Sequence, residues 1–198
     1  MVIKTRDRLI EVARQLFARK GVENTTMNDI ASASDKGRRT IYTYFKNKRD
    51  IFNAVIEQES AKLLVELEGI ADRDCSPLEK IEAFIGVRFE TMSEIVSRNG
   101  SLRAGFFRDV RKVERARKYI CRRESEILGD ILRQGVDEGV FSIESVSQTA
   151  VIIVHAIHGL DVPYMRDSLQ ELGLDKDLVV QRLTHLVLNG LRSRRIIS

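Results

Sequence analysis

The sequence predicts an all-α protein in which a small N-terminal three-helix unit precedes a larger helical domain. Apolar residues recur with the 3.6-residue period of amphipathic helices, and the 198 residues include two prolines. Charge is unevenly divided, because residues 1–50 contain 12 Lys and Arg against 6 Asp and Glu, whereas residues 51–198 contain 21 against 23. A positive excess in the first segment indicates a partner that carries phosphates. We expect domains at residues 1–47 and 48–198.

A short helix is expected to begin after Thr26. The Thr26 hydroxyl can cap backbone N–H groups, and Asp29 stands three residues on, where the second partner of a capping box reaches back. Met27, Ile30 and Ala31 then form one apolar face. The helix must end soon, because the residues that follow favour turns.

A second helix follows almost at once and carries cations on its first turn. Arg38, Arg39 and Thr40 open it, while Ile41 and Phe45 are spaced for burial. In a helix-turn-helix, the first residues of the second helix enter the major groove, where arginine reads guanine and threonine contacts a thymine methyl group or a phosphate. The alternative is that these charges form the solvated side of a helical hairpin. The predicted DNA contacts are Thr26, Lys36, Arg38, Arg39, Thr40, Tyr42, Tyr44, Lys46 and Lys48.

The run Thr-Ile-Tyr-x-Tyr-Phe-x-x-Lys starts at Thr40 and lies at a fixed distance from the pair Ile30-Ala31. Together with the residues around this run, it resembles the N-terminal domain of the tetracycline-repressor (TetR) family of bacterial transcription regulators over residues 6–52. The resemblance implies a helix-turn-helix DNA-binding domain followed by a helical ligand-binding and dimerisation domain. The other matching residues are Ile10, Ala13, Leu16, Phe17, Gly21, Thr25, Thr26 and Ile51.

The turn between the two helices departs from the family pattern. A glycine, an apolar residue and a serine are common there, whereas this chain has Asp35, Lys36 and Gly37. Lys36 is expected to point to solvent or to a phosphate, and Gly37 is an acceptable N-cap in place of a hydroxyl residue. Arg39 stands where glycine is frequent and adds a cation at the groove. The DNA sequence that this protein prefers therefore cannot be inferred from its relatives.

The larger domain is expected to consist of long amphipathic helices. Asn47 with Asp50 marks the start of a connecting helix. Ser76-Pro77-Leu78-Glu79 starts the next helix with a cap, a proline and a glutamate, and that helix stops at Asn99-Gly100. Gly139 is the expected end of the helix after it. The three remaining helices are predicted at residues 110–138, 144–167 and 176–194.

The last two predicted helices have broad apolar faces that a monomer would struggle to cover. The TetR resemblance implies that they pair with their copies in a homodimer, which would read a partly palindromic double-stranded DNA operator. It also implies that an unknown small-molecule effector enters the helical core. The predicted ligand contacts are Phe84, Phe89, Met92, Phe106, Phe107, His155, Tyr164 and Met165.

Two other features of the larger domain have more than one interpretation. A basic stretch lies at about residues 108–123. It could bind an acidic ligand or nucleic acid. Alternatively, it forms a solvated outer face on which the aliphatic parts of the Lys and Arg side chains cover apolar surface. Cys75 and Cys121 lack the spacing of metal ligands, so we expect ordinary reduced thiols. A redox switch at Cys121 is the alternative, because nearby arginines favour a thiolate.

Two other classes of function compete with a specific regulator. His155, His158 and Asp161 could converge from one helix in a metal-dependent sensor. An architectural protein that binds DNA without sequence preference would show the same phosphate contacts. We expect no enzymatic activity and no cofactor, because the sequence has no recognisable phosphate loop, paired catalytic carboxylates or thiol-histidine pair.

No segment of the sequence suggests membrane insertion or export. The apolar run around Val151–Val154 is far shorter than the roughly 20 residues of a membrane span. The N-terminus leads directly into an amphipathic pattern instead of a secretory signal. A cytoplasmic location is therefore expected.

Overall fold

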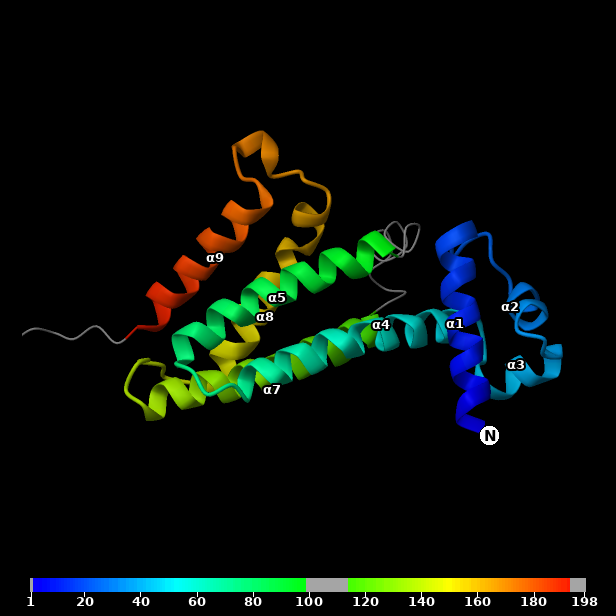
Figure 1. Cartoon of the computed structure of the whole chain (residues 1–198), viewed down its shortest axis with the longest axis horizontal. Helices are drawn as coiled ribbons and strands as arrows, with labels where there is room; N and C mark the ends of the chain where they lie inside the picture. The colour runs from blue at the N-terminus through cyan, green and yellow to red at the C-terminus, as the bar shows by residue number, and fades with distance from the viewer. Residues whose placement is uncertain (1, 99–113, 193–198) are drawn as a thin grey trace, which may run out of the picture. The chain divides into compact units, whose positions relative to one another are not determined.

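The computed structural model describes residues 2–98 and 114–192, which are built almost entirely from α-helices (Figure 1). The predicted all-α class is confirmed. Within the described ranges the chain forms two compact units, one with residues 2–61, 94–98 and 114–118, the other with residues 62–93 and 119–192. The expected domain boundary after residue 47 stays a prediction, since the connecting helix α4 (Lys48–Ala71) begins in the first unit and ends in the second.

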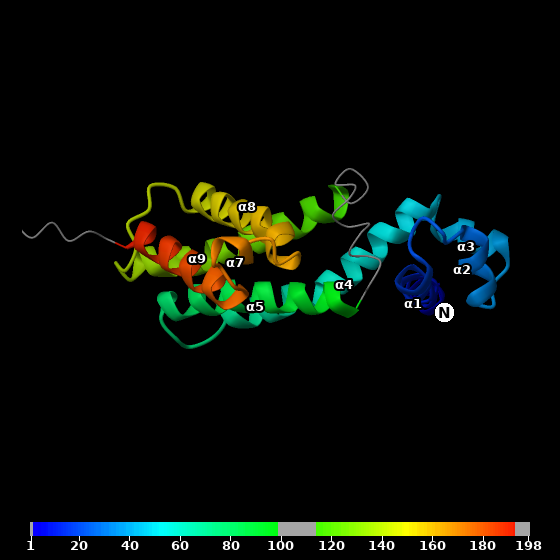
Figure 2. The ribbon, with the colours of Figure 1, turned by 90° about the horizontal axis from the view of Figure 1, so that it is seen from above.

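The first unit contains α1 (Val2–Lys20), α2 (Met27–Ala33), α3 (Arg38–Tyr44) and the start of α4. Helix α1 ends at Gly21, whose φ of 87° is the left-handed conformation that glycine adopts without steric cost. Helix α2 contacts both α1 and α3, as the two views show (Figure 2). Phe17 of α1 meets Phe52 of α4 edge to face at 5.8 Å between ring centroids, and Ile30 and Ile41 are fully buried. This core holds α3 in place.

The second unit contains most of α5 (Pro77–Arg98) and α7 (Glu114–Asp137), all of α8 (Val146–Met165) and α9 (Lys176–Leu191), and the 3-10 turn η2 (Gln170–Leu172). Helices α8 and α9 contact each other. The Ser142 N–H donates to the Leu191 carbonyl at 3.0 Å, which ties the end of α9 to the loop after α7. The apolar core is drawn from Ile81, Phe84, Ile85 and Phe89 of α5, Ile127, Leu128, Ile131 and Leu132 of α7, and Val154 and Ile157 of α8.

The helix starts predicted from capping signals are found at the expected residues. The Ser76 hydroxyl accepts a hydrogen bond from the Glu79 N–H at 3.3 Å, and the Glu79 carboxylate accepts one from the Ser76 N–H at 2.9 Å, so α5 begins at Pro77. Asn47 accepts from the Asp50 N–H at 3.0 Å at the start of α4. Each signal works because it pairs N–H groups that the helix itself leaves free.

The other predicted helix bounds agree in part. Gly139 follows α7 with a φ of 70°, as expected of a residue just past a helix. Helix α8 covers Val146–Met165 instead of residues 144–167, because the flanking Ser145 has an extended backbone conformation and Arg166 is the C-cap residue. The predicted stop at Asn99-Gly100, the beginning of the helix from residue 110 and the end of the helix to residue 194 lie outside the described residues.

Within the described ranges, no helix is both long enough and apolar enough to cross a lipid bilayer.

Candidate DNA-binding surface and buried charge cluster

Helix α2 begins with the capping box predicted from Thr26 and Asp29. The Thr26 hydroxyl accepts from the Asp29 N–H at 3.1 Å, and the Asp29 carboxylate accepts from the Thr26 N–H at 2.9 Å. These hydrogen bonds hold the pKa of Asp29 below its usual value. The box fixes the start of α2, and Ile30 and Ala31 bury its inner face.

The turn between α2 and α3 uses an aspartate where glycine is common in the TetR family. Asp35 has a φ of 54°, a left-handed conformation that Asp tolerates better than most other residues. Before it, the buried Ser34 donates its hydroxyl to the Ala31 carbonyl at 2.9 Å, and the Lys36 N–H donates to the same carbonyl at 3.0 Å. The turn is therefore closed mainly by backbone hydrogen bonds, while the Lys36 side chain is exposed.

Helix α3 presents its cations outward. Ile41 is fully buried, whereas Arg38 and Arg39 are exposed and Tyr42 is 44% exposed. The Arg38 guanidinium lies 5.8 Å from the centre of the Tyr42 ring, so this pair shares one face of the helix. An α-helix such as α3 is about 10–12 Å across with its side chains, so it fits a major groove about 12 Å wide.

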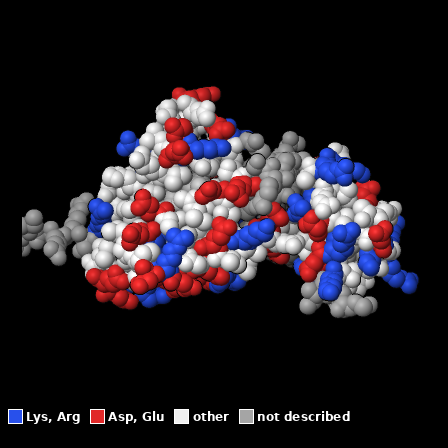
Figure 3. Space-filling model, in the orientation of Figure 1, with Lys and Arg blue, Asp and Glu red and all other residues white. Residues whose placement is uncertain are grey.

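The remaining predicted DNA contacts differ in how free their polar groups are. Lys46 is exposed, Thr40 and Tyr44 are partly buried, and the hydroxyl of Thr26 already serves the capping box. The Lys48 ammonium donates to two backbone carbonyls, those of Val22 and Glu23. Blue Lys and Arg side chains are frequent on the surface of α1–α3 in Figure 3.

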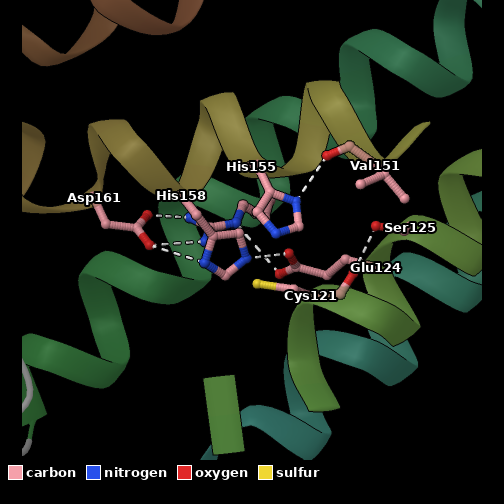
Figure 4. A network of polar contacts seen from close by, with 8 residues as sticks. Cys121, Glu124, Ser125, Val151, His155, His158 and Asp161 are labelled. Atoms are coloured by element: carbon pink, nitrogen blue, oxygen red, sulfur yellow. Dashed lines mark hydrogen bonds and ion pairs between the residues drawn. The ribbon is translucent and has the colours of Figure 1, made fainter. Parts of the chain in front are cut away.

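In the second unit, a buried cluster of four ionisable side chains connects three helices (Figure 4). Arg88 of α5 is fully buried and binds Asp161 of α8 through both Nη atoms, with the Nη2 to Oδ2 distance at 3.0 Å. Its Nε lies 3.3 Å from Oε1 of Glu124 on α7. His158 of α8 places Nε2 2.5 Å from Glu124 Oε2 and Nδ1 3.5 Å from Asp161 Oδ2.

The charges in this cluster support one another. Burial alone lowers the pKa of Arg88, but Glu124 and Asp161 raise it by more, so the guanidinium stays charged. Burial raises the pKa of Glu124, but the charge of Arg88 and the hydrogen bond from His158 more than offset this, so the net shift is downward. The cluster is therefore an ion pair network in which the carboxylates have hydrogen-bond donors.

Acid should lower the free energy of unfolding of the second unit by protonating Glu124. Because its pKa is lowered in the folded protein, its contribution to stability is present above the unfolded pKa of about 4.3 and is lost as pH falls through the folded pKa. We expect Glu124→Gln to flatten the fall of unfolding free energy below about pH 4.5. Urea unfolding at pH 3 to 7 measures this, and equal slopes for both proteins would contradict it.

The predicted ligand contacts mostly lie in the core of the second unit. Phe84, Phe89, Met92, Tyr164 and Met165 are buried. The rings of Phe89 and Tyr164 lie 4.7 Å apart, and the Arg88 guanidinium lies 5.7 Å from the Phe89 ring. His155 is exposed, and its Nδ1 donates to the Val151 carbonyl at 2.8 Å. Phe106 and Phe107 lie outside the described residues.

The three residues of the alternative metal site do not come together. His158 contacts Glu124 and Asp161, whereas the His155 ring donates to the Val151 carbonyl of its own helix (Figure 4). Across the described parts of the chain, no group of three or more His, Cys, Asp or Glu side chains could hold a metal ion. Cys75 and Cys121 form no disulfide within the described residues.

Two members of the buried cluster, Arg88 and Glu124, are not among the predicted site residues, although the sequence contains a signal for them. Arg88 falls on the apolar stripe of α5 between Phe84 and Met92, and Glu124 falls between Ile120 and Ile127 on α7. A charged residue inside an apolar stripe must be paired when buried. Opposite charges on the stripes of two helices therefore predict an ion pair.

Helices α2 and α3, joined by a tight turn and with the cations of α3 exposed, have the arrangement of a helix-turn-helix. The model of the tetR family of bacterial regulatory proteins matches residues 9–55. Residues 9–55 therefore carry an N-terminal domain of the TetR family, as the TetR resemblance predicted.

Curated relatives resemble parts of this chain, and a solved structure shares its fold. A probable acrEF/envCD operon repressor of Escherichia coli K12 is 35% identical over 94 residues, which are 47% of this chain and 43% of that protein. The regulator AcrR of Shigella flexneri is 27% identical over 79% of this chain and 76% of its own. A transcriptional regulator from Cytophaga hutchinsonii shares the fold with a TM-score of 0.70, 23% identity, and coverage of 93% of this chain and 97% of its own.

Proposed function

We propose that this protein is a transcriptional repressor that binds a two-fold symmetric operator as a homodimer and releases it when a small molecule binds the second unit. The observation that carries the proposal is the outward face of α3, where Arg38, Arg39 and Tyr42 are exposed while Ile41 anchors the helix in the core. Such a face supplies donors for base edges and for phosphates at once. Repression is also the role named for the matched Escherichia coli relative.

The homodimer is supported by apolar side chains that one chain leaves uncovered on its last two helices. Ile152 of α8 is 68% exposed and Leu186 of α9 is 70% exposed. Two small DNA-binding units related by two-fold symmetry would read two half-sites in successive major grooves. One unit alone makes few contacts, so the dimer is needed for tight and specific binding.

The small-molecule effector is supported by the aromatic core of the second unit, where Phe89 and Tyr164 pack together beside Arg88. A ligand there would act only if it binds the DNA-bound and released forms with different affinity. Typical coupling of about 1–3 kcal/mol would weaken operator binding roughly 5- to 150-fold.

The experiment that tests the function is selection of bound sequences from random duplex DNA by the purified protein at physiological salt. We expect a two-fold symmetric motif that is bound roughly 10³-fold or more tightly than random DNA. Retention of DNA without an enriched motif would favour the architectural role instead. Failure to retain any DNA would contradict the proposed function.

Substitutions on α3 should weaken specific binding without unfolding the protein. Arg38→Ala removes a donor to a base edge, and Tyr42→Ala removes its stacking partner. We expect the first to cost about 1–3 kcal/mol of operator binding and to relax the preference at one base position. Titration of labelled operator measures the operator affinity of both variants. Arg73→Ala, which changes an exposed arginine after α4, is the matched control, and unchanged affinity in both α3 variants would refute the groove assignment.

A further inference from the structure

The Lys48 ammonium is held by backbone far away in the sequence. Lys48 is the first residue of α4, and its Nζ lies 2.6 Å from the Val22 carbonyl and 3.1 Å from the Glu23 carbonyl. Those two carbonyls belong to the loop between α1 and α2. A charged amine that donates to carbonyl oxygens makes stronger hydrogen bonds than a neutral donor does.

That loop sets where α2 begins. Gly21 ends α1, and the buried Thr25 donates its hydroxyl to the Gly21 carbonyl at 2.8 Å. The next residue, Thr26, caps α2. Lys48 binds the two carbonyls that lie between these fixed points. The loop is therefore tied at one end by a hydroxyl of its own and in its middle by an amine from α4.

Lys46 offers a direct contrast two residues earlier. Its side chain is exposed, whereas Lys48 is partly buried with two of its three N–H donors directed at the loop. A lysine that neutralises a phosphate contributes to the salt dependence of DNA binding. A lysine that holds a loop does not contribute to that salt dependence.

We propose that Lys48 is a positioning residue, which supports DNA binding by fixing the entry of α2 against the start of α4 and not by pairing with a phosphate. This inference rests on the proposed DNA-binding function. Helix α2 contacts α3. Loss of the Lys48 hydrogen bonds to the loop would therefore let the whole helix-turn-helix shift against α4. Groove contacts lose affinity when their orientation is no longer fixed.

The test compares operator binding by the full-length protein and its Lys48→Met variant over a series of salt concentrations. We expect Lys48→Met to weaken binding roughly ten-fold at fixed salt, as the loss of charge-assisted hydrogen bonds implies, while the slope of log K against log salt is unchanged. Lys46→Met, the matched control, should lower the slope by about 0.9 if its ammonium contacts one phosphate. Lys48→Arg keeps the donors and should restore most of the affinity.

A second readout does not need DNA. Amide hydrogen exchange of residues 22–26 should speed up roughly ten-fold in Lys48→Met and return towards the wild-type rate in Lys48→Arg, because local opening controls exchange. A slope that falls by about 0.9 in Lys48→Met would overturn the positioning role, as would unchanged exchange in the loop. If the wild-type protein binds no specific DNA, the proposed function fails, and the exchange rates alone then decide the role of Lys48.

Discussion

Replacing Arg88 with alanine should lower the free energy of unfolding by about 3–5 kcal/mol. The substitution leaves the Glu124 and Asp161 carboxylates buried at a site where their shared cation is gone. Each carboxylate must then remain charged in an apolar environment or take up a proton, and both outcomes cost stability. It also removes packing between α5 and two other helices. This loss is a large share of the stability of an ordinary domain, which is typically about 5–15 kcal/mol.

Two control variants separate the buried charge from ordinary ion pairing. Arg133→Ala breaks an ion pair with Asp130, in which both side chains are largely exposed, and should change stability by less than about 1 kcal/mol. Arg88→Met combined with Glu124→Gln and Asp161→Asn removes the charges together, so it should recover part of the loss. Urea unfolding followed by circular dichroism measures all three. A loss below about 1 kcal/mol for Arg88→Ala would show that the cluster is not the buried network described above.

The first unit could be predicted closely because its signals are local. The capping box of Thr26 and Asp29 lies within four residues, and its geometry is the one expected. The buried positions Ile41 and Phe45 follow from helical spacing. The left-handed Asp35 could not be read from the sequence alone, because the backbone angle depends on how the turn packs.

The long-range contacts escaped prediction for a physical reason. Lys48 and Val22 are 26 residues apart, and Arg88 and Asp161 are 73 residues apart, so no periodic pattern connects them. The sequence predicts a phosphate contact for Lys48 and an alternative metal site formed by His155, His158 and Asp161. In the structure, Lys48 donates to two loop carbonyls, and His158 and Asp161 have the partners Glu124 and Arg88. The phosphate contact of Lys48 stays a prediction. Tertiary packing selects one partner among several that are chemically suitable.

In the larger domain, too, local features could be predicted from the sequence, whereas the roles of particular side chains could not. Its helices and their apolar faces follow from sequence periodicity, and Phe84, Phe89 and Met92 are buried as their spacing predicts. Whether these residues contact an effector stays a prediction, since a buried aromatic residue serves a core and a ligand site equally well. His155 illustrates the difficulty, because a helical position next to buried residues still left its side chain exposed.

Placing charge on the exposed apolar positions of α8 and α9 should dissociate the proposed homodimer. Ile152→Glu combined with Leu186→Glu puts a carboxylate at two positions where one chain leaves an apolar side chain uncovered. In an interface with two-fold symmetry every substitution occurs twice, so four carboxylates would be buried in the interface. We expect the dissociation constant of the dimer to rise by at least roughly 100-fold, since burying even one unpaired charge costs several kcal/mol.

The folded monomer should tolerate these changes, because both positions are largely solvent-exposed in one chain. Val65→Glu is the matched control, since Val65 of α4 is 66% exposed and lies on neither helix of the proposed interface. Sedimentation equilibrium gives the oligomeric state, and operator titration gives its consequence. The double variant should sediment as a monomer and lose specific operator binding, because a single half-site supplies too few contacts. A double variant that stays dimeric would place the interface elsewhere, and a monomeric wild-type protein would refute the homodimer itself.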